Sequence, residues 1–216
     1  MLKVIKNFTL ILMGLFLFGF HANAEQSPPL SFDQYSIKVK TEKAALTEWV
    51  EENAQASISV RIAKSIVHKT YDEAARLRLD PLLAIALMRA ESGFRPKAKS
   101  KAGAKGLTQV MPRFHKDKLA GRNPYDIDVS IEVGLTVLRD CLNKHKGVLT
   151  KALNCYSGGA GKRYYKTIAN YNASLSKHLV QYQFLNEKPI FARHSLTNPV
   201  VLHQYSIDDF QVAKSN

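Results

Sequence analysis

One carboxyl group, that of Glu91, is the side chain of this sequence best suited to acid–base chemistry. It is the only acidic residue between Pro81 and Lys116, a stretch that holds eight lysines and arginines. The preceding segment, Leu82–Met88, is apolar, so the carboxyl meets a low dielectric on one side, and this raises a carboxyl pKa. A carboxyl with a raised pKa can act as a general acid near neutral pH.

A purely structural role is the alternative for Glu91. Arg89 and Arg95 lie close in the sequence, and either could pair with the carboxylate at the end of a helix. Such a cation would lower the carboxyl pKa and so oppose the effect of burial. The residue types alone do not decide which effect is larger.

The elements around Glu91 are expected to be mainly α-helical. Apolar residues at helical spacing predict helices from Thr41 to about Asn53 and over Ser57–Leu79. Asp80 and Pro81 then predict the start of a helix that is apolar all round, and therefore buried, and that ends at Gly93. Residues 25–40 are expected to be irregular, 94–106 a loop and 107–111 a short helical turn. Further helices are expected from Pro112, from Asp126 or Asp128 to about His145, over Leu149–Tyr156 and over Ala173–Asn186.

The cysteine and histidine content limits the possible cofactors. Cys141 and Cys155 are the only cysteines, which excludes a four-cysteine zinc or iron–sulfur site. The seven histidines lack metal-ligand spacing, so neither a metal nor another cofactor is expected. In an oxidising compartment the two cysteines could form a disulfide that contributes about 3 kcal/mol. Both fall on apolar helical faces, so two buried free thiols are the alternative.

The first 24 residues have the pattern of a secretory signal peptide. Lys3 and Lys6 precede an apolar run, Phe8–Phe20, and residues 22–24 fit a small-x-small cleavage site. The run of 13 residues is short for a membrane span, which needs about 20 apolar residues, although an uncleaved anchor is an alternative. We expect a mature chain of Glu25–Asn216 in the periplasm or cell envelope, or secreted.

The chain is strongly basic. It has 31 lysines and arginines against 18 acidic residues, and its formal charge falls from +13 to +11 when Lys3 and Lys6 are removed. An excess of this size suggests an anionic partner. Export argues against nucleic acid and leaves an anionic membrane surface or an acidic wall polymer. A soluble, positively charged surface without a dedicated partner is the alternative.

Three motifs follow one another in a fixed order. They are AESGFRP at Ala90–Pro96, GLTQVMP at Gly106–Pro112 and ALNCYSGG at Ala152–Gly159. Together they resemble the catalytic domain of the soluble lytic transglycosylases, bacterial peptidoglycan-cleaving enzymes of the lysozyme-like fold. The resemblance covers residues 65–186. The resemblance implies a catalytic domain at 65–186. The parts outside it have no counterpart in the family, and we expect them to be the signal peptide at 1–24, an N-terminal leader and helix at 25–64 and an irregular C-terminal extension at 187–216.

The family's site residues carry over position by position. Its Glu-Ser motif matches Glu91-Ser92, and its Gly-Leu-Met-Gln motif matches Gly106–Gln109, with Thr108 in place of methionine. Its Ala-Tyr-Asn-Ala-Gly motif matches Cys155–Gly159, with Ser157 in place of asparagine. Both replacements shorten a side chain expected to line the cleft. The resemblance implies Glu91 as the catalytic residue and a substrate-binding set of Ser92, Thr108, Gln109, Tyr156 and Ser157.

The resemblance also implies a mechanism with one carboxyl group, whereas most glycosidases use two. Glu91 would protonate the oxygen between N-acetylmuramic acid and N-acetylglucosamine. The resulting carboxylate would take the proton of the muramic acid 6-hydroxyl, which closes a 1,6-anhydro ring without water. The lack of other acidic residues in the motif segments fits this scheme.

Supporting roles are expected for the other motif residues. Ser92 would either hydrogen-bond the catalytic carboxyl or cap the chain. Gln109 would bind a sugar or its acetamido group, and Tyr156 would orient the carboxyl or the transition state. Tyr164 and Tyr165, just after the third motif, could stack on a sugar or pack in the core.

Two other functions stay open at the level of the sequence. A water-using muramidase of the same fold would need a second carboxyl group from residues 117–140. A wall-binding or assembly module could keep the fold without cutting. In all three cases the expected partner is the peptidoglycan glycan strand, bound by a monomer, and a further partner in an envelope complex is not identified.

Overall fold

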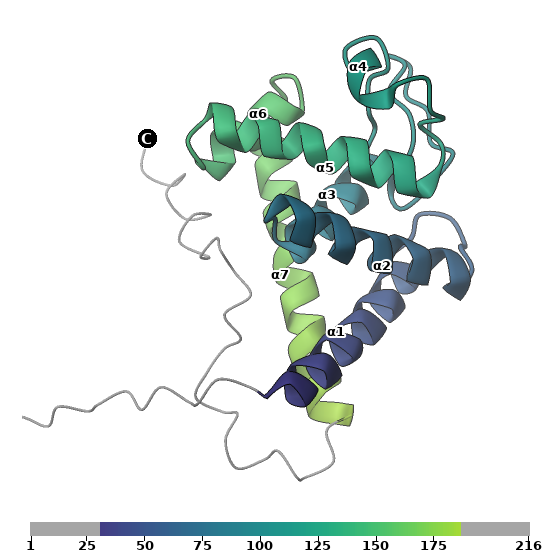
Figure 1. The fold of residues 1–216 in the computed structure, drawn as a ribbon, viewed down its shortest axis with the longest axis vertical. Helices are drawn as coiled ribbons and strands as arrows, with labels where there is room; N and C mark the ends of the chain where they lie inside the picture. The colour runs from purple at the N-terminus through teal and green to yellow at the C-terminus, as the bar shows by residue number, and fades with distance from the viewer. Residues whose placement is uncertain (1–30, 187–216) are drawn as a thin grey trace, which may run out of the picture. The chain divides into compact units, whose positions relative to one another are not determined.

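The computed structural model describes residues 31–186, which form seven α-helices and no strand (Figure 1). The predictions for residues 1–24 and 187–216 lie outside the described residues. The chain divides into two compact units between Tyr35 and Ser36, and the candidate site lies in the second unit. The helices are α1 (Phe32–Glu52), α2 (Val60–Leu77), α3 (Pro81–Ser92), α4 (Lys116–Leu119), α5 (Ile127–Lys144), α6 (Leu149–Tyr156) and α7 (Gly161–Asn186).

Helix α3 is the buried centre of the second unit. The Asp80 side chain caps its start by accepting a hydrogen bond from the Leu82 N–H, with 2.8 Å between the heavy atoms. Gly93 ends it with a φ of 57°, a left-handed conformation that glycine adopts without strain. Every side chain of Leu82–Met88 is buried. The predicted start, burial and end of this helix are confirmed, and Glu91 lies in its last turn.

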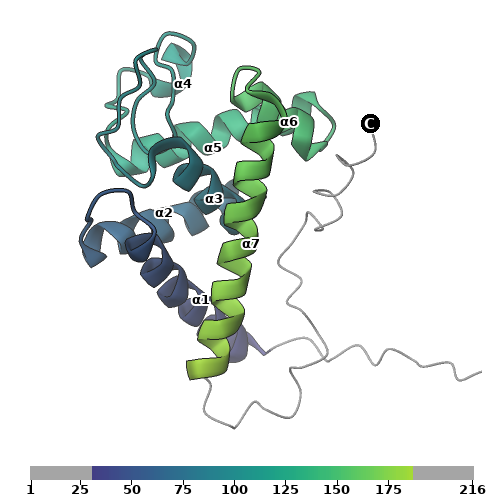
Figure 2. The ribbon, with the colours of Figure 1, turned by 180° about the vertical axis from the view of Figure 1, so that it is seen from behind.

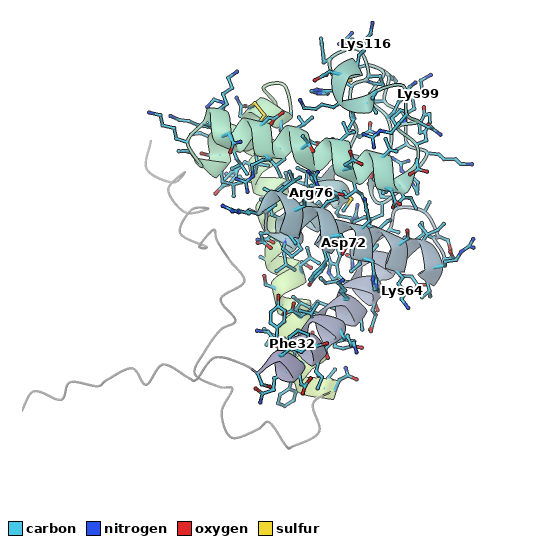
Figure 3. All side chains as sticks on the ribbon, viewed as in Figure 1. Phe32, Lys64, Asp72, Arg76, Lys99 and Lys116 are labelled. Atoms are coloured by element: carbon cyan, nitrogen blue, oxygen red, sulfur yellow. A yellow bond between two sulfur atoms is a disulfide. The ribbon has the colours of Figure 1, made fainter. Side chains whose placement is uncertain are left out.

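Helices α2 and α7 pack against α3 (Figures 1 and 2). Helix α2 also packs against α5. Helix α6 contacts α5 on one side and α7 on the other. The segment between α3 and α5 carries exposed lysines, of which Lys99 and Lys116 are labelled in Figure 3. No helix in residues 31–186 has both the length and the apolar composition that crossing a membrane requires.

Two further helices begin or end as predicted from local signals. The Asp126 side chain caps α5 by accepting hydrogen bonds from the N–H groups of Asp128 and Val129. Helix α6 covers Leu149–Tyr156, as its apolar spacing predicts. In both cases the determining signals lie within the helix or its first turn.

Helix α1 corrects the expectation of an irregular leader up to residue 40. It begins at Phe32 because Ser31 and Gln34 form a reciprocal capping box. The predicted cap, Thr41, instead lies inside the helix, where its hydroxyl donates to the Ile37 carbonyl. Helix α2 is slightly shorter than predicted, and Ser59 caps it.

Helix α7 is also longer than predicted, since it begins at Gly161 rather than Ala173. Its first half buries Tyr165, Ile168 and Asn172. Because two of these three buried side chains are aromatic or polar, the first half of the helix lacks the apolar periodicity that predicts a helix. The earlier start brings Tyr164 onto a helix that contacts α3.

Short elements between α3 and α5 differ from expectation as well. Residues 107–109 lie in a turn, as expected, but the short helix expected from Pro112 begins only at Lys116, as the four-residue α4. Isolated bridges pair Lys105 with Lys99 and with Val110, which keeps residues 98–110 compact.

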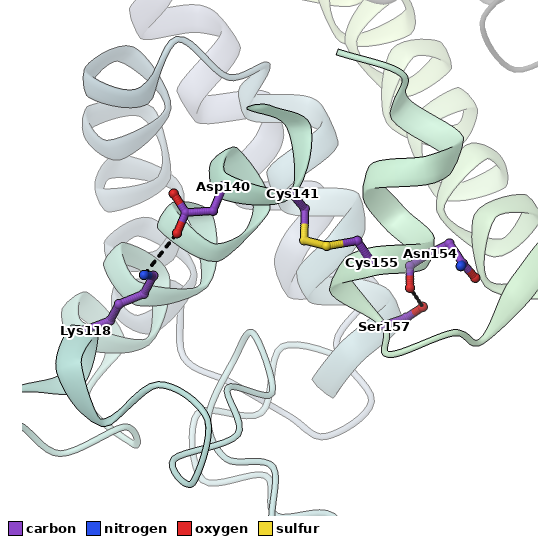
Figure 4. Close-up of a disulfide and its surroundings, with 6 residues drawn as sticks. All are labelled: Lys118, Asp140, Cys141, Asn154, Cys155 and Ser157. Carbon is purple, nitrogen blue, oxygen red and sulfur yellow. Dashed lines mark hydrogen bonds and ion pairs between the residues drawn. A yellow bond between two sulfur atoms is a disulfide. The ribbon is translucent and has the colours of Figure 1, made fainter. Parts of the chain in front are cut away.

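Cys141 of α5 and Cys155 of α6 form a disulfide (Figure 4). Of the two states left open by the sequence, the structure therefore has the bonded one. The bond fixes α6 to α5 one residue before Tyr156, a candidate site residue.

Candidate active site

The carboxyl group of Glu91 lies at the C-terminal end of α3 and is largely shielded from water. Burial raises its pKa from 4.5 to about 7. The Tyr164 hydroxyl donates a hydrogen bond to Glu91 Oε1, and this contact favours the charged form. Near neutral pH the group therefore exists in both protonation states, as an acid that later acts as a base requires.

Neither arginine near Glu91 pairs with it. Arg95 donates from Nε to the Ser92 carbonyl, 2.8 Å away. The Arg89 guanidinium lies over the Tyr171 ring, 5.0 Å from its centroid. No cation within residues 31–186 forms a salt bridge with Glu91 or shifts its pKa. Burial thus outweighs the local basic charge, and the alternative of a helix-end ion pair is wrong.

Tyr164 is the functional contact that sequence reasoning missed. It was expected to stack on a sugar or pack in the core, but its hydroxyl reaches Glu91, 73 positions earlier. Burial and the nearby Glu91 charge raise the pKa of Tyr164, so the phenol stays protonated and acts as a donor. The position of Tyr164 just after the third motif was the one sequence signal for a role in the site. Because the helix was expected to begin at Ala173, Tyr164 was not expected to lie on a helix beside Glu91.

Tyr156 lies near Glu91 and Tyr164 but does not form a hydrogen bond with the Glu91 carboxyl. Its hydroxyl donates to the Thr108 carbonyl, with 2.7 Å between the oxygens. Burial, followed by the charge of Glu91, raises the pKa of Tyr156, which places the phenol within electrostatic reach of the carboxyl. The contact joins the second motif to the third across 48 positions.

Gln109 is held by its own loop. It has a φ of 49°, and its Nε2 donates to the Gly106 carbonyl at 2.9 Å and to the Ala98 carbonyl at 3.3 Å. Gly106 has a φ of 79°, and a Cβ there would lie 2.1 Å from the Pro124 carbonyl oxygen. Gln109 and Tyr156 line one hollow of about 40 Å³, together with Val110, Met111, His115 and Val137.

Thr108 and Ser92 face the interior. The Thr108 side chain is 0% exposed, and its hydroxyl donates to the Ser130 carbonyl at 2.7 Å. Ser92 is 1% exposed and donates to the Met88 carbonyl, rather than to the carboxyl of Glu91. Such buried side chains present no surface to a sugar. The expectation that Thr108 lines the cleft is corrected, and both residues instead support the loop and helix that carry the site.

Ser157 shapes the turn after α6 (Figure 4). Its hydroxyl donates to the Asn154 carbonyl at 3.2 Å and accepts from the Ala160 N–H at 3.1 Å. The side chain is half-buried, so the turn that carries the two following glycines is held from within the loop.

Two acidic residues of the 117–140 segment, where a second catalytic carboxyl was a possibility, are held in ion pairs. Glu132 is paired with Arg122 at 2.8 Å, and Asp140 with Lys118 at 3.0 Å. None of the other acidic side chains within residues 31–186 shifts the pKa of Glu91. The same residues contain no cluster of three His, Cys, Asp or Glu side chains that could hold a metal ion.

Residues before α2 also support the end of α3. The Gln55 N–H donates to the Gly93 carbonyl at 3.0 Å. Trp49 of α1 meets Phe94 edge to face, with 6.0 Å between ring centroids. These contacts fix the chain directly after Glu91, and no motif in the sequence indicated them.

This chain is similar in sequence to known transglycosylases. A protein-family model described as "Transglycosylase SLT domain" matches residues 70–180. A curated protein of Enterobacteria phage PRD1, named "Transglycosylase", is 38% identical over 88 residues. The match covers 41% of this chain and 32% of the phage protein, so the chain spans about a third of that relative's length.

Proposed function

Because the chain belongs to the transglycosylase SLT family, we propose that it is a peptidoglycan lytic transglycosylase with Glu91 as its single catalytic acid and base. One observation carries the proposal. The carboxyl of Glu91 is shielded from water, has a pKa of about 7 and accepts a hydrogen bond from the Tyr164 hydroxyl, and no other carboxylate within residues 31–186 shifts its pKa. A two-carboxyl mechanism would place a second acidic group within about 5–9.5 Å.

In the first step, protonated Glu91 donates its proton to the glycosidic oxygen between N-acetylmuramic acid and N-acetylglucosamine. The bond from that oxygen to C1 of the muramic acid breaks, and positive charge develops at C1. Glu91 becomes a carboxylate, which the Tyr164 O–H stabilises by a charge-assisted hydrogen bond.

In the second step, the Glu91 carboxylate takes the proton of the muramic acid 6-hydroxyl. The hydroxyl oxygen forms a bond to C1 and closes the 1,6-anhydro ring. Glu91 regains its proton, so the cycle consumes no water. A pKa near 7 suits both steps, because the group neither holds nor releases the proton too strongly.

The substrate-binding roles are part of the proposal. Gln109 and Tyr156, which line the same small hollow, would contact the sugar chain from the surface around it. Ser157 would act through the turn that it holds. Thr108 and Ser92 act only by positioning, since their side chains are buried.

We also propose that the protein works outside the cytoplasm, in the periplasm or envelope or after secretion. The residue pattern of the first 24 positions supports export. The Cys141–Cys155 disulfide supports an oxidising compartment.

The test is mass spectrometry of muropeptides released from peptidoglycan by the purified protein. Glu91→Gln is compared with wild type and with Glu48→Gln, an exposed control on α1. We expect products ending in 1,6-anhydromuramic acid from wild type and Glu48→Gln, and none from Glu91→Gln. Reducing ends, heavier by one water, would make the protein a muramidase, and no products from wild type would favour a non-cutting role.

A further inference from the structure

A basic hollow lies between α1 and α2, away from the helices and loops that carry Glu91. Its volume is about 410 Å³. Its lining contains three lysines and one histidine but no acidic residue. The lining residues are Lys40, Lys43, Ala44 and Thr47 of α1, with Lys64 and His68 of α2.

The lysines of this hollow are not paired with any carboxylate of the described residues. No salt bridge within residues 31–186 involves Lys40, Lys43 or Lys64. Lys69, one turn further along α2, is by contrast paired with Glu73 at 2.9 Å. The three ammonium groups therefore remain available to an external anion.

A cation–π contact and a pKa shift describe the charge on the side chains that line the hollow. The Lys43 Nζ lies 5.0 Å from the centre of the Tyr71 ring, a cation–π contact that leaves its positive charge uncompensated. Burial, with the charges of Lys43 and Lys64, lowers the pKa of His68, while Asp72 opposes this effect. His68 is therefore mostly neutral at pH 7, and the three lysines supply the positive charge. Figure 3 shows Lys64 and Asp72 along α2.

We infer that this hollow binds carboxylate groups of the stem peptides on peptidoglycan, as a second contact to the same polymer that Glu91 cleaves. The inference rests on the proposed function. A glycan strand repeats its peptides, so a strand held in the active site carries further carboxylates, and these stay tethered to the protein while the strand is bound. The second contact is then effectively intramolecular, and several weak ion pairs add up to useful retention.

Binding is tested in a Glu91→Gln background, so that the polymer is not cut. Lys43→Gln/Lys64→Gln is compared with Lys144→Gln/Lys151→Gln, which removes the same charge from exposed positions elsewhere. We expect the hollow variant to bind insoluble peptidoglycan about two- to tenfold more weakly than the control variant, as the loss of two exposed ion pairs implies. Equal binding by the two variants would overturn the inference.

Chemical modification of the polymer identifies the anion. Amidation of the peptidoglycan carboxylates should remove the difference between the two double variants. If the difference persists after amidation but disappears when phosphate-containing polymers are stripped from the wall, the hollow binds phosphate and the carboxylate assignment is wrong.

The His68 ring reports on the hollow without any substitution there. Addition of a soluble N-acetylmuramoyl peptide should raise the pKa of His68, measured by NMR, because a carboxylate favours the imidazolium. His145, at the end of α5, is the internal control. A response of His68 to inorganic phosphate alone, or no response at all, would contradict the inference.

Cleavage assays separate this inference from the proposed function. With Glu91 intact, the Lys43→Gln/Lys64→Gln variant should cleave peptide-free glycan strands like wild type and peptide-bearing strands more slowly. Loss of cleavage by wild type would contradict the proposed function, whereas equal rates of the variant and wild type on both substrates would contradict only the role of the hollow.

Discussion

Replacing Tyr164 with phenylalanine removes the O–H that donates to Glu91 Oε1 and keeps the ring. A hydrogen bond to a charged group contributes about 1.5–3 kcal/mol, and one pKa unit corresponds to about 1.36 kcal/mol. Water can replace part of the lost bond, because Glu91 is not fully enclosed. We therefore expect the Glu91 pKa to rise by about one unit, from about 7 towards about 8.

The sign of the effect on activity follows from the role of Glu91 as an acid. The first step needs the protonated group, so kcat/KM falls as the pH rises through the pKa of Glu91. Tyr164→Phe should move this alkaline limb upward by about one unit. It should also lower the maximal rate roughly tenfold or more, because the carboxylate formed in the first step loses its donor.

Two measurements test this reasoning, namely the pH profile of kcat/KM and the titration of the Glu91 carboxyl by carbon-13 NMR. Tyr182→Phe is the matched control, since Tyr182 lies on the same helix and does not bond to Glu91. Both quantities should change in Tyr164→Phe and stay at wild-type values in Tyr182→Phe. An unchanged Glu91 pKa in Tyr164→Phe would refute the argument, whatever the rate.

Three further predictions concern stability. The folded protein keeps the Glu91 proton up to about pH 7, whereas the unfolded chain releases it near 4.5, so the wild type loses up to about 3 kcal/mol of stability as the pH rises between these two values. The melting temperature of Glu91→Gln should therefore rise relative to that of wild type as the pH increases from 5 to 8. A difference between the two melting temperatures that does not change with pH would contradict this. Reduction of Cys141–Cys155 should lower the free energy of unfolding by about 3 kcal/mol, measured in urea with and without dithiothreitol. Gly134→Ala places a methyl group 2.3 Å from Thr108 Oγ1 and should cost about 1–3 kcal/mol in thermal unfolding, and an unchanged melting temperature would show that the loop adjusts freely.

Much of the fold around the site was predictable because its signals are local. The Asp80 cap, the proline after it and Gly93 lie within or beside the helix that they delimit. Asp126 likewise caps α5 through the N–H groups of its first turn. The start of α7 was missed because the buried face of its first half contains Tyr165 and Asn172, which weaken the apolar periodicity on which the prediction depended.

The roles of the motif residues were less predictable than their positions. Thr108 occupies a motif position, yet its side chain is buried against Ser130 and Gly134. Tyr164 lies outside the three motifs and contacts the carboxyl directly. Whether a side chain faces the cleft or the core depends on which distant segment packs against it, and a motif does not contain that information.

Chain order and residue type were enough to single out Glu91, since its isolation from other acids and its place after an apolar helix can be read directly. They were also enough to find the ends of the helix that carries it. The state of its carboxyl depends on the tertiary structure, because burial and basic neighbours shift a pKa in opposite directions. Burial by α7 and a hydrogen bond from a tyrosine 73 positions away determine the result, and both arise only when distant parts of the chain pack together.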